Sequence, residues 1–223
     1  MRRLGVFGGT FDPVHYGHLV CADQLREAFA LDRVMFVPAN RSPHKPGYRP
    51  APAGHRLKMV ELAVRGCRGF TVSDLEIKRG GTSYTVDTVR YLRRQFGSGP
   101  ELWLLLGMDA YLEVTAWKNL EAVVGQCFMG VACRPGYKAA RVPKVVSEKA
   151  LFAEITPVDI SSTDIRCRAR QGRSIRFLVP PSVEAYVRRY GLYGSASRGD
   201  AGTVGRPRGG IAAVMSRPGS RQL

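Results

Sequence analysis

The sequence has few acidic residues and lacks a long apolar run. Its 223 residues include 34 lysines and arginines but only 18 aspartates and glutamates, which gives a formal net charge of +16. Such an excess favours polyanionic partners: nucleotides, nucleic acid or anionic lipid. No apolar stretch reaches membrane-spanning length, and the start MRRLGVFGG has too few apolar residues for a signal peptide. We therefore expect a cytosolic protein that does not engage a membrane.

The common cysteine and glycine motifs are also missing. The five cysteines are odd in number and form no C-x-x-C pair, so neither a disulfide framework nor a zinc site is indicated. The sequence contains no G-x-x-x-x-G-K-[ST], and Gly5, Gly8 and Gly9 have the wrong spacing for G-x-G-x-x-G. These absences exclude the ordinary kinase-type and dinucleotide-binding loops.

Short β-like runs alternate with helix-like runs along the chain. The β-like runs are residues 4–7, 34–37, 70–73, 102–106, 128–132 and 153–156, and the helix-like runs include 17–30, 56–64, 84–96, 120–124 and 183–190. This alternation predicts an α/β fold with a mainly parallel sheet and helices on both faces. We expect one domain over residues 1–194 with a small C-terminal helical part. The Arg-rich segment 195–223 lacks periodicity and is expected to be a disordered basic tail.

Chemically informative segments follow three of the predicted strands. They are residues 8–18, 40–45 and 107–109. Because ligands collect at the carboxyl edge of a parallel sheet, these segments are expected to converge on one site. The proline-rich segment 38–52 is expected to form a loop over that site.

The segment GGTFDPVHYGH, residues 8–18, carries the strongest signal. Gly8 and Gly9 are expected to adopt backbone angles that a Cβ would forbid. Helical spacing beyond Gly17 places His18 in the first turn of a helix and His15 just before it. Backbone N–H groups at such a helix start attract phosphate, and two imidazoles add donors. The alternative is a glycine-rich turn with two surface histidines.

Two further segments carry donors suited to phosphate. His44 and Lys45 add two cationic groups to the proline-rich loop, although such a pair is often a plain surface feature. The motif ISSTDIR indicates a helix start at which Ser162, Thr163 and Arg166 face the open end. The alternative reading of this motif is a helix cap without a ligand.

Taken together, the motifs resemble bacterial nicotinate-nucleotide adenylyltransferases of the nucleotidyltransferase superfamily. They are GGTFDPVHYGH with its H-x-G-H signature, PANRSPHK, a His-Arg pair, SYTVDT, LLGMD, an Ala-Trp pair, ISSTDIR and VPPSVEAYVRRYGLY. They occur in the family's order and cover about residues 3–194. The resemblance implies a Rossmann-like nucleotidyltransferase fold. It also implies adenylyl transfer from ATP to nicotinate mononucleotide, which yields deamido-NAD and pyrophosphate in NAD biosynthesis.

The resemblance also implies roles for individual residues. His15 and His18 would be catalytic, as stabilisers of the transferring phosphate. The residues implied in ATP binding are Gly8, Gly9, Thr10, Phe11, His15, His18, Gly107, Asp109, Ser162, Thr163 and Arg166. Those implied for the acceptor are His44, Lys45, Tyr84, Thr85 and Trp117, with Trp117 stacking on the pyridine ring. Mg²⁺ is the implied cofactor, bridged by ATP phosphates and held by no protein side chain.

Other functions are compatible with parts of this pattern. A sibling adenylyl- or cytidylyltransferase would act on another phosphate acceptor, such as nicotinamide mononucleotide, but SYTVDT and Trp117 argue against it. A nucleic-acid-binding protein is disfavoured because the basic residues are not interleaved with aromatic ones as in common RNA modules. The sequence leaves the oligomeric state open, and a homo-oligomer is compatible with it.

Overall fold

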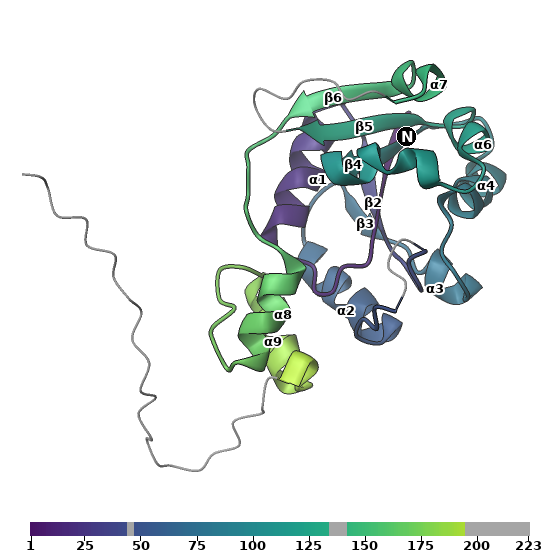
Figure 1. The fold of residues 1–223 in the computed structure, drawn as a ribbon. Coiled ribbons are helices and arrows are strands. Elements are labelled where there is room, and N and C mark those ends of the chain that lie inside the picture. The colour runs from purple at the N-terminus through teal and green to yellow at the C-terminus, as the bar shows by residue number, and fades with distance from the viewer. Residues whose placement is uncertain (44–46, 134–141, 195–223) are drawn as a thin grey trace, which may run out of the picture.

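The computed structural model describes residues 1–43, 47–133 and 142–194. Its centre is a six-stranded sheet with the order β3-β2-β1-β4-β5-β6 (Figure 1). The strands are β1 (Arg3–Gly9), β2 (Arg33–Pro38), β3 (Phe70–Val72), β4 (Glu101–Gly107), β5 (Phe128–Cys133) and β6 (Ala150–Glu154). All five neighbouring pairs run parallel. The predicted parallel α/β architecture is confirmed.

The helices connect successive strands and then form the C-terminal part. They are α1 (Tyr16–Ala28), α2 (Ala53–Val64), α3 (Leu75–Arg79), α4 (Thr85–Phe96), α5 (Met108–Leu112), α6 (Leu120–Val124), α7 (Lys144–Ser147), α8 (Ser162–Arg170) and α9 (Pro181–Arg189). Two short 3₁₀ helices are η1 (Val114–Ala116) and η2 (Leu192–Gly194). Among the described residues, no helix combines the length and apolar character needed to cross a membrane.

Two hydrophobic cores lie on opposite faces of the sheet. One contains buried residues of α1, α2, α8 and α9 together with alternate strand residues such as Phe36 and Leu105. The other contains buried residues of α4 and α6 together with the strand residues that point the other way, such as Leu104 and Met129. Because β4 is buried on both faces, its apolar run Trp103 to Leu105 contributes to both cores. The sheet therefore has helices on both faces, as predicted.

Some elements differ from the sequence-based expectation. Strand β6 is shifted toward the N-terminus of the predicted run 153–156, and its Leu151 and Phe152 are exposed. This strand pairs only with β5 in the described sheet, so one edge lacks the burial that makes periodicity informative. The short helices α3, α5 and α7 were not predicted, because segments of four or five residues carry little helical periodicity; α6, which is equally short, was predicted.

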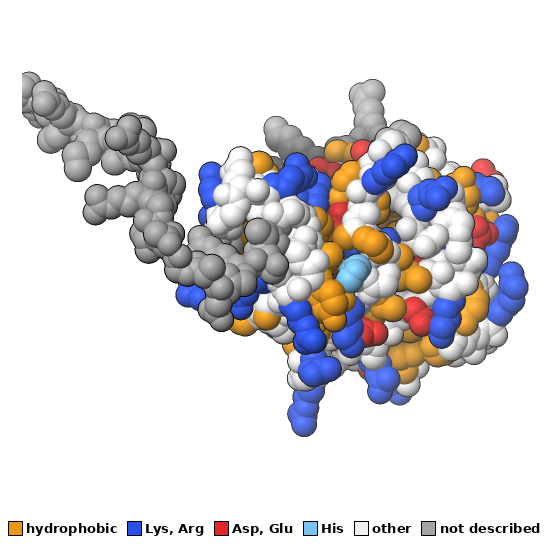
Figure 2. All heavy atoms as spheres, turned by 90° about the horizontal axis from the view of Figure 1, so that it is seen from below, with side chains coloured by type: hydrophobic (Ala, Val, Ile, Leu, Met, Phe, Trp, Pro, Cys, Tyr) orange, Lys and Arg blue, Asp and Glu red, His pale blue; other side chains and the backbone are white. Residues whose placement is uncertain are grey.

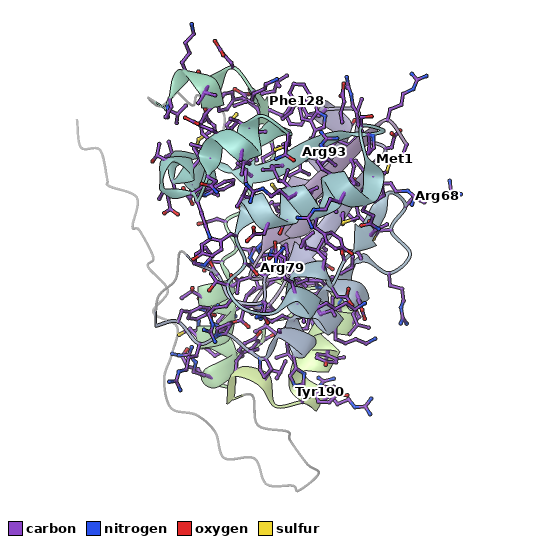
Figure 3. The ribbon with its side chains drawn as sticks, turned by 90° about the vertical axis from the view of Figure 1, so that its right-hand side faces the viewer. Met1, Arg68, Arg79, Arg93, Phe128 and Tyr190 are labelled. Atoms are coloured by element: carbon purple, nitrogen blue, oxygen red, sulfur yellow. The ribbon has the colours of Figure 1, made fainter. Side chains whose placement is uncertain are left out.

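The C-terminal helices α8 and α9 lie at one end of the molecule, next to α2 (Figure 1). The Ser182 hydroxyl on α9 donates to the Leu62 carbonyl on α2 at 3.2 Å, and Tyr16 N donates to the Leu178 carbonyl at 3.1 Å. Figure 3 shows Tyr190 at this end and Phe128 at the opposite end. The C-terminal part thus packs against the region where α1 begins. The predicted tail 195–223 lies outside the described residues.

Candidate active site

Strand β1 extends to the end of the glycine pair, which changes the role predicted for Gly8 and Gly9. The ladder with β2 continues to the pair Gly9 and Pro38, so the backbone stays extended there. We predicted backbone angles at Gly8 and Gly9 that a residue with a Cβ could not adopt, and this prediction is wrong. The residue of this segment with a positive φ, 48°, is Phe11. The absence of side chains at the two glycines instead leaves room beside the end of the strand. A Cβ at Gly8 would point into open space, and one at Gly9 would lie 2.9 Å from the Phe11 ring.

His15 and His18 lie side by side at the start of α1, as predicted. His15 is the N-cap residue, and its backbone N–H donates to His18 Nδ1 at 3.2 Å. The two ring centroids are 3.7 Å apart with an interplanar angle of 31°. A Cβ on Gly17 would approach the His15 ring to 3.1 Å, which explains the glycine between the histidines. The structure therefore brings both imidazoles to one helix start.

The protonation state of His15 follows from its burial. Only 6% of the residue is exposed, and desolvation lowers the pKa of its imidazole to about 4. His15 is therefore neutral at pH 7 in the ligand-free protein. A neutral imidazole donates one hydrogen bond to a phosphate oxygen without carrying a charge of its own.

The second predicted phosphate site, at the start of α8, packs directly against the loop after β1. Ser161 is the N-cap, and its Oγ accepts from Asp164 N at 3.0 Å. Ser162 Oγ donates to the Pro13 carbonyl at 2.9 Å. Arg166 donates from Nη1 to the Asp12 carbonyl at 2.8 Å and from Nη2 to Thr163 Oγ1 at 3.1 Å. The two predicted phosphate-binding segments are thus held together by direct hydrogen bonds.

A cavity of about 280 Å³ lies beside the glycine pair and contains part of the predicted acceptor site. Its lining includes Gly8, Gly9, Thr10, Thr85 and Trp117, together with Ala39, Ser42, Glu76, Ser83 and Thr88. A smaller adjoining cavity of about 200 Å³ is lined by Tyr84, Thr85, Trp117 and Lys118. The Lys118 Nζ atom lies 4.6 Å from the centre of the Tyr84 ring. The glycine pair and the predicted acceptor residues Thr85 and Trp117 thus line the same cavity, although they are far apart in the sequence.

A separate cavity of about 320 Å³ borders the start of α1. It is lined by Gly17, Gly107 and Asp109, together with Cys21, Met108, Ala132, Cys133 and residues 155–158. Asp109 is exposed in α5, in the first turn of that helix. Gly107 at the end of β4 and Asp109 in α5, both predicted to bind ATP, therefore border a different cavity from Thr85 and Trp117.

One face of the molecule carries more basic than acidic side chains. Figure 2 shows the molecule from below, where Lys and Arg side chains are spread around the face and Asp and Glu are fewer. His44 and Lys45, the two cations predicted for the acceptor side, lie outside the described residues. Their neighbours Ser42 and Pro43 do line the acceptor cavity. Among the described residues, no group of three or more His, Cys, Asp or Glu side chains could hold a metal ion.

Sequence reasoning missed a buried polar cluster behind the phosphate loop. Asp12 is 2% exposed, and its carboxylate accepts hydrogen bonds from the Tyr193 hydroxyl at 2.6 Å and from the Tyr48 hydroxyl. Burial and the hydrogen bond to Asp12 raise the pKa of Tyr48 to about 12, and the same causes raise the pKa of Tyr193. The Arg166 guanidinium lies 5.0 Å from the Tyr48 ring centre. Nothing local in the sequence predicts these pairings, because the partners are distant along the chain.

Arg56 is a second residue whose importance the sequence did not reveal. It lies on α2, is 1% exposed and donates to backbone carbonyls of the loops after β1 and β2. The sequence signal was the His-Arg pair at residues 55–56, which was part of the resemblance but had no role attached to it.

The parallel sheet and the H-x-G-H helix start, with the two cavities described above, define a nucleotidyltransferase. A family model described as cytidylyltransferase-like matches residues 6–168, so the chain belongs to that broad family. Within it, the chain belongs to the nicotinate-nucleotide adenylyltransferases, as the similarity to proteins of that name demonstrates. The predicted family and class of enzyme are confirmed.

Two relatives named "Probable nicotinate-nucleotide adenylyltransferase" illustrate this similarity. The protein of Moorella thermoacetica is 43% identical over 198 residues, which cover 86% of this chain and 91% of the relative. The protein of Thermus thermophilus is 47% identical over 191 residues, which cover 86% and 99%. The Plasmodium falciparum nicotinic acid mononucleotide adenylyltransferase complexed with NaAD matches with a TM-score of 0.72 at 18% identity. That match covers 88% of this chain and 99% of the other, and it confirms the fold.

Proposed function

We propose that this chain transfers the adenylyl group of ATP to nicotinate mononucleotide at the start of α1. ATP would lie toward the cavity that contains Gly107 and Asp109, and the mononucleotide would lie in the cavity that contains Thr85 and Trp117. The proposal is supported by the position of α1. Gly17 lines the first cavity, and Gly9 and Thr10 line the second, so a phosphate beside the histidines would be accessible from both.

His15 and His18 are assigned to the α-phosphate of ATP. Both rings lie at the start of a thirteen-residue helix, where the positive end of the helix dipole attracts an anion. The neutral His15 would donate one hydrogen bond, and a bound polyphosphate would raise its pKa by favouring the charged form. Donors placed where charge accumulates during transfer lower the barrier without further reorganisation.

The start of α8 is assigned to the pyrophosphate leaving group. Arg166 and Thr163 already share a hydrogen bond there, which orients the guanidinium before any ligand binds. Ser162 contributes through its hydrogen bond to the Pro13 carbonyl, which keeps the two phosphate-binding segments in contact. Asp109, exposed beside its cavity, would accept a hydrogen bond from a ribose hydroxyl.

The acceptor's pyridine ring is assigned to Trp117, and its carboxylate to the start of α4. Tyr84 is the N-cap of that twelve-residue helix and Thr85 its first residue, so unpaired N–H groups and the positive dipole end face the cavity region. A carboxylate satisfies these donors better than a carboxamide, which favours nicotinate over nicotinamide. His44 and Lys45 stay predictions for the mononucleotide phosphate.

We expect Mg²⁺ to bind together with ATP. The groups around α1 and α8 are mainly N–H, hydroxyl and guanidinium donors, which suit phosphate oxygens and not a cation. A bound Mg²⁺ would thus be coordinated by triphosphate oxygens, where it would neutralise developing charge. The protein residues would bind and align the substrates around it. No general base is required, because the attacking mononucleotide phosphate is already an anion at neutral pH.

The observation that carries the proposal is the contact between the His15 and His18 rings, whose centroids are 3.7 Å apart. Their helix start borders the cavity of Gly107 and Asp109, and the loop before it contributes Thr10 to the cavity of Thr85 and Trp117. The test is pyrophosphate release from ATP with nicotinate mononucleotide and, separately, with nicotinamide mononucleotide at equal concentration. We expect faster release with nicotinate mononucleotide by about one to two decades. Replacement of ATP by CTP in the same assay separates this activity from that of a sibling cytidylyltransferase. Absence of turnover with nicotinate mononucleotide would refute the assignment.

A further inference from the structure

The buried side chain of Arg56 joins the two loops that follow β1 and β2. Its Nε donates to the Ala51 carbonyl at 2.8 Å, and its Nη1 donates to the carbonyls of Thr10 at 2.8 Å and Ala39 at 2.6 Å. Its Nη2 donates to the Asn40 carbonyl at 3.0 Å. Thr10 belongs to the loop after β1, and Ala39 and Asn40 follow β2. A planar guanidinium with fixed donor directions therefore sets the spacing between these loops.

Burial opposes the charged form of the Arg56 guanidinium. Arg56 is 1% exposed, and desolvation lowers the pKa of its guanidinium. The nearby Asp12 carboxylate acts in the opposite direction, but the four hydrogen bonds described above all go to neutral carbonyls. Apolar residues of similar volume are often at least as stabilising as buried charges. An apolar side chain at this position would avoid the desolvation of a charge, but it could not hold the loop carbonyls at fixed positions.

The loop that Arg56 holds is tied in turn to the acceptor side. Asn40 N donates to Ser83 Oγ at 3.0 Å, and Asn40 Nδ2 donates to the Gly81 carbonyl at 2.8 Å. Ser83 N donates to the Arg41 carbonyl at 2.8 Å. Gly81 and Ser83 immediately precede the start of α4. A continuous set of hydrogen bonds therefore connects Thr10 with the segment that presents Tyr84 and Thr85.

A buried carboxylate completes this network on the far side. Glu76 is 7% exposed and accepts a 2.5 Å hydrogen bond from Thr88 Oγ1 on α4, and Arg79 donates to the same hydroxyl at 3.4 Å. Burial raises the pKa of Glu76, while its contacts with Thr88 and Ser83 act in the opposite direction. Figure 3 shows Arg79 in the middle of the molecule, between the ends marked by Phe128 and Tyr190. The start of α4 is thus fixed from α3 as well as from the loop after β2.

We propose that Arg56 is a positioning residue for adenylyl transfer, which sets the separation between the phosphate-binding loop and the acceptor-binding loop. Arg56 acts from behind the wall that Thr10 and Ala39 present to the acceptor cavity. It aligns the two substrates without contacting either. The inference rests on the proposed function, because it assumes that the two loops carry different reactants.

The experiment compares Arg56→Lys with Arg93→Lys. Lysine keeps the charge but cannot reproduce the fork that reaches four carbonyls. Arg93 is a matched control, because its guanidinium also donates to backbone carbonyls, at Gln126 and Pro100, away from the cavities. Figure 3 labels this residue on the side of the molecule opposite Tyr190. Both exchanges are expected to lower the unfolding temperature.

Binding and chemistry are then measured separately, at a temperature where circular dichroism shows both variants folded. Calorimetry gives Kd for a non-hydrolysable ATP analogue and for nicotinate mononucleotide, and rapid quench gives the single-turnover rate at saturation. For Arg56→Lys we expect each Kd to stay within about threefold and the rate to fall about 100-fold, the scale of a misalignment near 1 Å. Arg93→Lys is expected to keep the wild-type rate.

Three results would overturn the inference: a wild-type rate in Arg56→Lys, a loss confined to one Kd, or an equal loss of rate in Arg93→Lys. If Arg56→Lys does not fold, Asn40→Ala replaces it, because this variant removes the Gly81 link and leaves the buried charge in place. We expect its single-turnover rate to fall about tenfold, and an unchanged rate would refute the network. Inactivity of the wild-type protein with nicotinate mononucleotide would instead refute the proposed function.

Discussion

The Tyr193 hydroxyl donates a 2.6 Å hydrogen bond to Asp12 Oδ1, which connects residues 181 positions apart in the sequence. Tyr193 itself adopts a positive φ of 63°, an uncommon conformation for a tyrosine. The same loop is held by Arg166, which donates to the Asp12 carbonyl. The C-terminal part of the chain therefore supports the loop that precedes His15 and His18.

The substitution Tyr193→Phe tests whether the C-terminal part stabilises the loop that contains Asp12. Because Asp12 is buried, loss of one hydroxyl donor is expected to destabilise the protein by about 1 to 3 kcal/mol. The measurement is the free energy of unfolding in urea. Tyr190→Phe is the control, since Tyr190 is 49% exposed and neighbours Tyr193 in the sequence. Equal free energies of unfolding for the two variants would mean that the hydrogen bond from Tyr193 to Asp12 does not stabilise the protein.

His18→Ala is expected to lower the single-turnover rate by about 100-fold or more, the scale of losing one preorganised donor. Rapid-quench measurement at saturating substrates separates this effect from binding. His55→Ala provides the comparison, because His55 Nδ1 contacts the Tyr186 hydroxyl at 2.9 Å, in the packing between α2 and α9. A near-wild-type rate in His18→Ala would contradict the role assigned to this residue.

The burial of His15 predicts a dependence of stability on pH. Its pKa is about 4 in the folded protein against an ordinary value of 6.5, so the unfolded chain binds the proton first as the pH falls. The stability present above pH 6.5 is therefore lost progressively down to pH 4, by on the order of 3 kcal/mol. Urea unfolding across this range measures the loss. In His15→Gln the curve is expected to be flatter, and an unchanged slope would assign the loss to other groups.

Nucleotide binding should be linked to proton uptake by the same residue. A bound polyphosphate favours the charged imidazole and so raises the pKa of His15 from about 4. Calorimetry of ATP-analogue binding at about pH 5, in buffers of different ionisation enthalpy, measures the protons taken up. We expect net uptake in the wild type and less uptake in His15→Gln. Equal uptake in both proteins would exclude His15 as the proton acceptor.

Trp117 is expected to report acceptor binding by fluorescence. The chain has two tryptophans, and the other, Trp103, is 5% exposed in the core between Phe29 and Phe128. Nicotinate mononucleotide should quench Trp117 by stacking, and Trp117→Ala should weaken its binding about tenfold, as expected for one aromatic stack. Trp103→Phe is expected to retain the quenching. Quenching that depends on Trp103 would contradict the stacking role.

The extent of successful prediction differs between elements for a physical reason. Strand β4 was predicted from an unbroken apolar run, and helix α4 from apolar residues at helical spacing over twelve residues. The histidine pair was predicted because both members lie within one helix turn of each other. The angles of Gly8 and Gly9 were predicted wrongly, since pairing of β1 with β2 continues through them. No local sequence pattern predicts how far the pairing of two strands extends.

The sequence by itself determined the family, the parallel α/β class and the position of His15 and His18 at a helix start, because these depend on motifs and on short-range periodicity. Only the tertiary structure decided which side chains support that site. Arg56 donates to four carbonyls in the loops after β1 and β2, and Asp12 accepts hydrogen bonds from Tyr48 and Tyr193. Such partners are chosen by how distant segments pack, and each buried polar group must find its hydrogen bonds wherever the fold brings donors and acceptors together.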